Sequence, residues 1–142
     1  MQFFKKLSLQ LLLFTPLFWF VEILQNLCYK LVLGEYGWYF PTGQFHWFSF
    51  QTLPSWAIAL TIMAVCYEYI CKPKNLAVWQ YYVLAGTICW AAEWINGYLH
   101  AEVLQQPLYV WTYSPLKYVG IEAIVLWWSD VWLYDYLRKK LA

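Results

Sequence analysis

The chain has 142 residues, about one domain's length, and its composition is far from that of a water-soluble protein. Charged residues make up 12% and hydrophobic residues 63%, against about 25% charged residues in a typical soluble domain. A soluble chain so short and apolar would expose broad apolar patches to water. We therefore expect an integral, multi-pass membrane protein. The formal net charge of +1 creates no basic field, so nucleic acid is not an expected partner.

Four apolar stretches are each long enough to cross about 30 Å of hydrocarbon as a helix. They cover residues 7–29, 50–71, 76–99 and 116–137. Gly and Pro residues interrupt the first and third connections, and Lys72-Pro73-Lys74-Asn75 forms the second. The predicted fold is all-α, a single transmembrane domain of four helices over residues 1–142.

The basic residues predict how these helices are oriented. Seven of the nine belong to the N-terminus, the second connection and the C-terminus, which share one side if there are four spans. Lys30 and Lys117 lie on the other side. Because Lys and Arg concentrate in cytoplasmic loops, both chain ends are expected in the cytoplasm, at a bacterial inner or a photosynthetic membrane. Glu68 and Asp135, beside basic residues at cytoplasmic helix ends, are expected to act as interfacial anchors or in local ion pairs.

Several motifs recur in the same order in the two halves. Trp19-Phe20-Val21-Glu22 matches Trp90-Ala91-Ala92-Glu93 at an offset of 71, and Trp38-Tyr39 loosely matches Trp111-Thr112. Tyr67-Glu68-Tyr69 matches Tyr134-Asp135-Tyr136 at an offset of 67. We infer two tandem repeats, at about 7–72 and 76–140. Each has two helices, so the halves share one orientation and are related by a pseudo-twofold axis along the membrane normal.

Polar side chains form a stripe on the first helix and another on the third. The first stripe has the spacing i, i+3, i+4, i+7, which places its residues on one helix face: Glu22, Gln25, Asn26 and Tyr29. The equivalent positions of the third helix are Glu93, Asn96, Gly97 and His100. A charge at the bilayer centre costs about 3 kcal/mol or more, so both stripes should face inward, toward each other. They serve either as interhelical contacts or as a functional site.

Glu22 and Glu93 are the expected catalytic pair, because two acids buried near one axis share a proton. A neutral carboxylic acid in a dry pocket can protonate a double bond. The predicted ligand-binding residues around the pair are Gln25, Asn26, Asn96, His100, Glu122, Trp38, Trp111 and Tyr113. The aromatic connections 34–49 and 101–114 either form an interfacial belt or fold over the bundle as a lid.

The histidines and cysteines define no metal site. His46 and His100 both lie toward the outer face and leave open an axial bond to a haem iron or a chlorophyll magnesium. The four cysteines contain no Cys-x-x-Cys pair and fall within or at the ends of apolar stretches, which is typical of small buried hydrophobic residues. No protein metal site and no certain cofactor is predicted, and a bound lipid, carotenoid or other pigment is compatible with the sequence.

An intramembrane Glu, an aromatic loop and a new helix follow one another in each half. The loops contain Tyr36-Gly37-Trp38-Tyr39 and Trp111-Thr112-Tyr113, and the helices open near Pro54 and Glu122. This order resembles small membrane-embedded carotenoid cyclases and hydratases, in which buried acids protonate a polyene. The resemblance implies an isoprenoid or carotenoid ligand. The chain departs from the cyclase pattern after Glu122, where Ala123 replaces the second of two paired acids.

Three functions follow from these features. The first is binding, or acid-catalysed modification, of an apolar isoprenoid ligand. The second is a non-catalytic subunit of a larger respiratory, photosynthetic or transport complex, which would suit a small, Trp-rich chain. The third is half of a dimeric transporter, in view of the repeat and the intramembrane acids. The expected partners are membrane lipids together with an apolar small molecule, other transmembrane subunits or a second copy of the chain.

Overall fold

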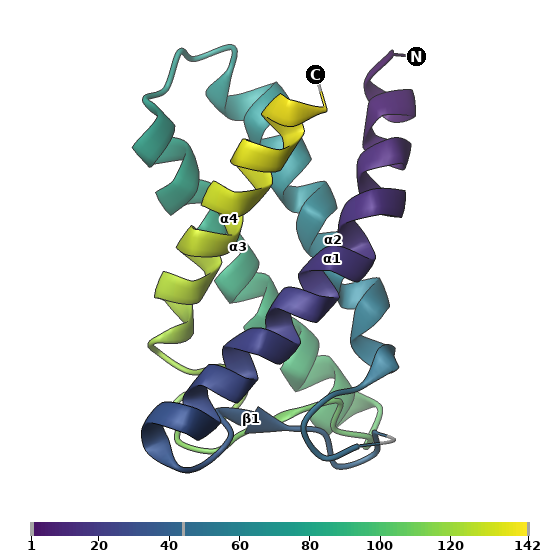
Figure 1. Ribbon diagram of the computed structural model, residues 1–142, viewed down its shortest axis with the longest axis vertical. Coiled ribbons are helices and arrows are strands. Elements are labelled where there is room, and N and C mark those ends of the chain that lie inside the picture. Colours follow the sequence, from purple (N-terminus) through teal and green to yellow (C-terminus); the bar gives the residue numbers. More distant parts are fainter. Residues whose placement is uncertain (1, 44, 142) are drawn as a thin grey trace.

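A computed structural model describes residues 2–43 and 45–141 and consists of four helices and a short two-stranded ribbon (Figure 1). The helices are α1 (Gln2–Leu33), α2 (Leu53–Val65), α3 (Val78–Tyr98) and α4 (Ala123–Lys140). A 3₁₀ turn (Phe50–Thr52) precedes α2, and π-helical turns extend α2 (Cys66–Cys71) and α3 (Leu99–Val103). The strands are β1 (Trp38–Tyr39) and β2 (Val110–Trp111). The predicted all-α class is confirmed.

The first and last helices differ from their predicted bounds, and α1 already begins at Gln2. α1 continues past residue 29 to Leu33, and Gly34 ends it with a φ of +79°, a left-handed conformation that glycine adopts without strain. α4 begins at Ala123 and not near 116, because residues 115–122 form turns and bends after Pro115. Pro16 lies within α1, and the helix is continuous through it.

Two segments are long and apolar enough to cross a membrane, Gln2–Leu33 and Phe50–Cys71. Within residues 2–43 and 45–141, α3 and α4 do not reach the same apolar level. Both are rich in Trp and Tyr and contain acidic residues, which lower their mean hydropathy. Length and composition therefore support two membrane-crossing segments, and the four-span arrangement with both ends in the cytoplasm stays a prediction.

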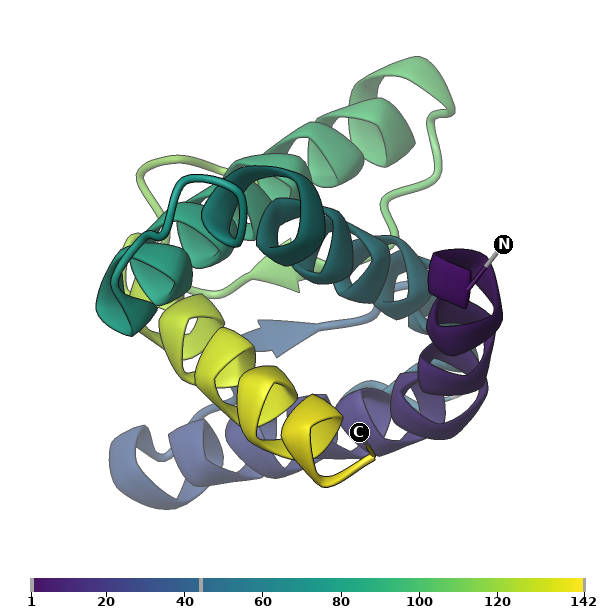
Figure 2. The same cartoon turned by 90° about the horizontal axis from the view of Figure 1, so that it is seen from above.

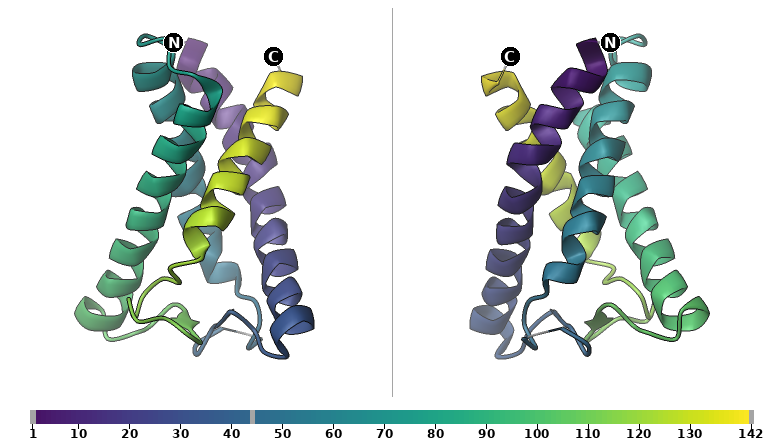
Figure 3. Two further views of the ribbon diagram at one scale, coloured as in Figure 1. Left: turned by 90° about the vertical axis from the view of Figure 1, so that its left-hand side faces the viewer. Right: turned by 90° about the vertical axis from the view of Figure 1, so that its right-hand side faces the viewer.

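Both chain ends and the connection between α2 and α3 lie at one end of the bundle, and the strands lie at the other (Figures 1 and 3). α1 packs against α2, α3 packs against α4, and α2 contacts both α3 and α4. The view from above shows the four helices arranged around a common axis (Figure 2). In the side views of Figure 3, α1 and α3 diverge toward the strand end.

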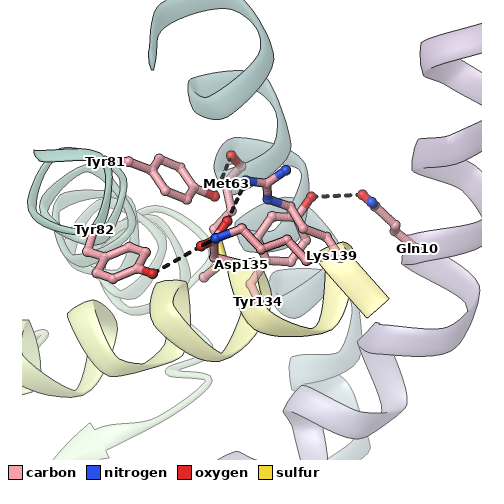
Figure 4. Close-up of polar contacts among 8 residues, drawn as sticks. Gln10, Met63, Tyr81, Tyr82, Tyr134, Asp135 and Lys139 are labelled. Carbon is pink, nitrogen blue, oxygen red and sulfur yellow. Dashed lines mark hydrogen bonds and ion pairs between the residues drawn. The ribbon is translucent and has the colours of Figure 1, made fainter. Parts of the chain in front are cut away.

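The end that carries the chain termini is filled by an apolar core and a polar cluster. Phe18, Leu60 and Met63 are fully buried there. The Tyr134 hydroxyl donates to Gln10 Oε1 at 2.8 Å, and Asp135 pairs with two basic residues of its own helix, Arg138 and Lys139 (Figure 4). The Tyr82 hydroxyl also donates to Asp135, at 3.0 Å. Together with the Lys72–Glu68 pair at 2.7 Å, these contacts confirm the expected local ion pairs.

The strands cover the opposite end of the bundle. β1 and β2 are antiparallel, with Trp38 opposite Trp111, and both indoles are buried. The fully buried Asn26 holds β1 against α1: its Nδ2 donates to the Trp38 carbonyl oxygen at 2.8 Å, and its Oδ1 accepts from the Trp38 N–H at 3.3 Å. The connections therefore fold over the bundle as a lid.

Residues 71 positions apart make matching contacts in the two halves. Trp19 donates to the Ser49 carbonyl at 2.8 Å, as Trp90 does to the Gly120 carbonyl at 2.9 Å. Trp56 donates to Glu22 at 2.7 Å, as Trp127 does to Glu93 at 2.6 Å. The position pairs 10/134 and 63/81 also correspond, with the donor exchanged: Tyr134 donates to Gln10, and Tyr81 donates to the Met63 carbonyl. These contacts agree with the offset of 71 along all four helices, including α4, where the sequence motif had suggested 67. Duplication itself stays a prediction.

Gly86 on α3 allows the closest approach to α4, and its replacement should destabilise the fold. A Cβ atom there would lie 2.5 Å from Trp128 Cδ1 and 3.0 Å from the Trp128 backbone nitrogen, which cannot move without shifting α4. We expect Gly86→Ile to cost about 1–3 kcal/mol of stability through overpacking. Thermal unfolding in detergent micelles measures this, with Ala91→Ile on the exposed face of α3 as the control. Equal melting temperatures for the two variants would contradict the close packing.

Candidate functional site

A cavity of about 120 Å³ lies between the apolar core and the ribbon, and all four helices contribute to its wall. An apolar cavity of about 150 Å³ binds benzene, so this space suits a group of about that size or somewhat smaller. The wall contains four Trp, one Tyr and three acids. The lining residues that bear on function are Glu22, Gln25, Trp38, Thr52, Ser55, Trp56, Ile58, Ala59, Ile62, Cys89, Ala92, Glu93, Asn96, Tyr109, Trp111, Trp127 and Asp130.

Glu22 reaches the cavity from the middle of α1 and is held by side chains at the start of α2. Trp56 Nε1 donates to Glu22 Oε2 at 2.7 Å, and Thr52 Oγ1 donates to the same oxygen at 3.1 Å. The carboxyl group is thus fixed by the helix that packs against its own. Glu22 is partly exposed because it borders the cavity.

Glu93 occupies the corresponding place on α3 and is held in the same manner. Trp127 Nε1 of α4 donates to Glu93 Oε2 at 2.6 Å, and Trp111 Nε1 of β2 donates to Oε1 at 3.2 Å. The Tyr109 hydroxyl donates to the backbone carbonyl of Glu93 at 2.6 Å. Both carboxylate oxygens therefore accept an indole N–H, which restrains the plane of the carboxyl group.

The four indoles in the cavity wall, three of which donate to the two acids, also meet in pairs. The rings of Trp56 and Trp127 have centroids 5.2 Å apart, and those of Trp38 and Trp111 are 4.7 Å apart. These are favourable separations for aromatic pairs. An indole donates a hydrogen bond but accepts none through its nitrogen, so none of these bonds supplies or removes a proton. Any proton on the acids comes from solvent or from a ligand.

Asp130 on α4 is a third acid in the cavity wall, and it is almost completely buried. Gln25 Nε2 of α1 donates to Asp130 Oδ1 at 2.8 Å and so connects the first helix with the last. Across the cavity, Asn96 Nδ2 of α3 donates to Ser55 Oγ of α2 at 3.2 Å. Two amide side chains at equivalent positions, Gln25 and Asn96, therefore join the two halves of the protein.

The charges in the wall are unbalanced. Among the described residues that line the cavity there are three carboxyl groups and no Lys, Arg or His. An unpaired carboxylate is costly in a site with little water, and neutral indole donors offset only part of that cost. The three acids therefore need protons, or a cation, to balance them. The arrangement is suited to storing and donating protons.

The predicted site residues divide into three groups. Glu22, Glu93, Gln25, Asn96, Trp38 and Trp111 line one cavity, and the first four belong to the predicted inward-facing stripes. Asn26 lies behind the wall and holds β1, and Glu122 accepts a hydrogen bond from the Tyr29 hydroxyl at 3.2 Å without lining the cavity.

His100 and Tyr113 lie away from the cavity. His100 belongs to the π-helical turn beyond α3, and the 64%-exposed Tyr113 donates to Glu35 Oε2 at 2.8 Å at the outer surface. Neither side chain lines the cavity with the acids, and their predicted role in ligand binding stays a prediction. The i+7 spacing put His100 on the stripe, but by that position the chain has left the regular α-helix.

Several residues of the cavity wall are not among the site residues predicted from the sequence. They are Thr52, Ser55, Trp56, Tyr109, Trp127 and Asp130. The repeat contained a signal for two of them, since Trp56 and Trp127 lie 34 positions after Glu22 and Glu93 respectively. Asp130 was noticeable as an acid in an apolar helix, but its distance from Glu22 in the chain gave no reason to bring the two together.

Within the described ranges 2–43 and 45–141, no group of three or more His, Cys, Asp or Glu side chains is arranged to hold a metal ion. His46 is exposed and stacks on Tyr39, with ring centroids 4.7 Å apart.

Comparisons of this chain with protein-family models, with curated proteins and with solved structures found no match.

Proposed function

We propose that this chain is a multi-pass membrane protein that binds the end of an apolar isoprenoid molecule in its cavity and protonates it through Glu22 and Glu93. The observation that carries the proposal is the presence of three carboxyl groups, without a basic partner, in one aromatic cavity. A whole carotenoid is far longer than a benzene-sized space, so the proposal concerns one end of such a molecule.

Exposed apolar side chains support the membrane setting. Large apolar residues such as Leu12, Leu31 and Val32 on α1, Trp79 on α3 and Trp132 on α4 face outward. In water such a surface would promote aggregation, whereas hydrocarbon accepts it. Both chain ends and the connection between α2 and α3 lie at one end of the bundle, which is what four crossings with both ends in the cytoplasm require.

The chemistry of the acids supports proton transfer to a carbon–carbon double bond. One neutral carboxyl group gives its proton to one carbon of the double bond, and a carbocation forms at the other carbon. The faces of aromatic rings attract cations, and four Trp and one Tyr surround the space. Loss of a proton from a neighbouring carbon to the second carboxylate then completes a double-bond shift or a ring closure. The sequence is redox-neutral and returns the pair with its proton on the other acid.

A non-catalytic subunit of a larger membrane complex is the second candidate. The observation that favours it is the outer side of α1, where Leu9, Leu13, Leu17, Phe20 and Leu24 are all exposed. Their spacing of three or four residues forms an apolar stripe, which lipid covers in an isolated protein and a neighbouring helix covers in a complex. The two candidates differ in whether other protein subunits remain bound to the chain after it is extracted from the membrane with detergent.

Neutralising either acid should abolish the proposed reaction. We expect Glu22→Gln and Glu93→Gln each to remove an isoprenoid product from the extracted lipids, because the amide keeps the shape of the side chain but has no carboxylic proton. Mass spectrometry of lipids from cells that express each variant measures this. Glu122→Gln, an acid outside the cavity, is the matched control. Identical lipids for wild type and both cavity variants would refute the enzymatic proposal.

Labelling of single cysteines tests the four crossings. In a background without the exposed Cys28, we expect Gln105→Cys to react with a membrane-impermeant maleimide on intact cells. Lys74→Cys, at the opposite end of the bundle, should react only after the cells are made permeable. Labelling of both positions only in permeable cells would leave two crossings, α1 and α2.

Native electrophoresis after extraction in a mild detergent separates the two candidate functions. We expect the tagged 17.1 kDa chain to migrate alone or as a pair of copies, since lipid suffices to cover α1. Mass spectrometry of the excised band identifies any accompanying chain. Stoichiometric co-migration with other membrane subunits would favour the second candidate instead.

A further inference from the structure

We propose that the ligand enters the cavity sideways from the bilayer, through the contact between α2 and α3, and that Ile58 controls this entry. The inference rests on the proposed membrane setting and adds the route and the shape of the ligand: a linear apolar molecule whose end lies among the acids while its body remains in lipid.

Both ends of the bundle are closed. Toward the chain termini, the buried side chains of Phe18, Leu60 and Met63 belong to the apolar core next to the cavity, and the Tyr134–Gln10 and Asp135 contacts lie beyond them. Toward the strands it ends at the ribbon, where the Trp38 and Trp111 rings are in contact and Asn26 holds the backbone of β1. A ligand that enters along the axis would have to displace one of these layers.

The cavity wall formed by α2 includes a side chain that is also exposed on the outside of the bundle. Ser55, Ile58, Ala59 and Ile62 form one face of α2 at the spacing i, i+3, i+4, i+7, and all four line the cavity. Ile58 is also 60% exposed on the outside of the bundle, so this single side chain borders both the cavity and the surroundings. On α3, the cavity wall includes the small side chain of Ala92.

Two polar contacts frame this part of the wall. Asn96 Nδ2 donates to Ser55 Oγ at 3.2 Å on the strand side, and Cys89 Sγ contacts the Ala59 carbonyl oxygen at 3.8 Å toward the core. The aliphatic side chains of Ile58 and Ala92 line the cavity between these contacts. An isoleucine can change rotamer without breaking a hydrogen bond, so entry past Ile58 leaves both contacts intact.

On the matching side, between α4 and α1, a hydrogen bond joins the two helices beside the cavity. The position of Ala59 corresponds, at an offset of 71, to Asp130, which is hydrogen-bonded to Gln25 of α1. The position of Ile58 corresponds to Ser129, which is exposed and does not line the cavity. The two halves therefore differ at the positions that border the route, and we assign the entry to the side between α2 and α3.

The dimensions restrict the ligand. A space of about 120 Å³ accepts the terminal group of a chain, and the gap between two packed helices accepts a single chain in cross-section. A linear lipid or isoprenoid with an unsubstituted end fits this description, whereas a fused ring system does not. Glu22, Glu93 and Asp130 are then the first polar groups that the inserted end meets.

Photolabelling in vesicles tests the route. The purified full chain is placed in phosphatidylcholine vesicles that contain a fatty acid with a diazirine at its terminal carbon, a group that labels carboxylic acids efficiently, and mass spectrometry locates the adducts. In wild type we expect adducts on the cavity acids as well as on the outer side of α1. Ile58→Trp should slow labelling of the cavity acids about tenfold, equivalent to a barrier increase of roughly 1.4 kcal/mol. Ile58→Ala should accelerate it.

Ser129→Trp is the matched control, because it adds the same bulk at the corresponding exposed position of the other wall. Cavity labelling unchanged by Ile58→Trp, or reduced equally by Ser129→Trp, would overturn the proposed route. So would labelling of α1 alone in wild type. If cavity labelling depends on Ile58 but Glu22→Gln and Glu93→Gln leave the cellular lipids unchanged, the route stands and the proton chemistry fails. Absence of all adducts would instead reject the membrane setting on which both rest.

Discussion

The hydrogen bond from an indole N–H to a buried carboxyl group is the interaction on which the rest of this structure depends. Glu22 and Glu93 lie in helices with too few polar groups to solvate an acid, and each is held by a Trp from the helix that follows it in the chain. The same bond therefore stabilises the acid and fixes α1 against α2, or α3 against α4. Losing it would both unpair a buried polar group and loosen a helix pair.

The two halves share the Trp–acid hydrogen bonds that join their helices, but they differ in several side chains around the cavity. Matching Trp residues hold matching acids, and matching Trp rings meet, Trp56 with Trp127 between the helices and Trp38 with Trp111 in the ribbon. The exceptions are at positions where a side chain in one half has a smaller or apolar counterpart in the other, as with Asp130 and Ala59, or Asn26 and Gly97. The absence of a side chain at Gly97 lets Tyr118 approach, since a Cβ there would lie 2.8 Å from Tyr118 Cβ. Because of such differences, the two repeated halves enclose a single cavity whose walls are not equivalent.

The cavity combines features that rarely occur together in a packed protein interior. Its wall is mainly aromatic, which favours apolar or cationic groups, and it contains three acids without a basic residue among the described lining side chains. A salt bridge would have neutralised the acids permanently. Indole donors fix their positions while leaving them able to bind and release protons. A site built only to hold helices together would need neither the empty space nor the uncompensated acids.

The sequence by itself determined the features that arise from local spacing and composition. Few charges and long apolar stretches predict helices, and the i, i+3, i+4 spacing of Glu22, Gln25 and Asn26 predicts that their helix turns one polar face inward. The tertiary structure alone decided which side chains complete the site, where α4 begins, and that His100 and Tyr113 lie outside. These depend on contacts between residues tens of positions apart, such as Trp56 with Glu22 and Gln25 with Asp130, and on the relative bulk of Ala59 and Asp130 across neighbouring helices. Periodicity within one helix carries no information about the size of the side chains that another helix presents to it.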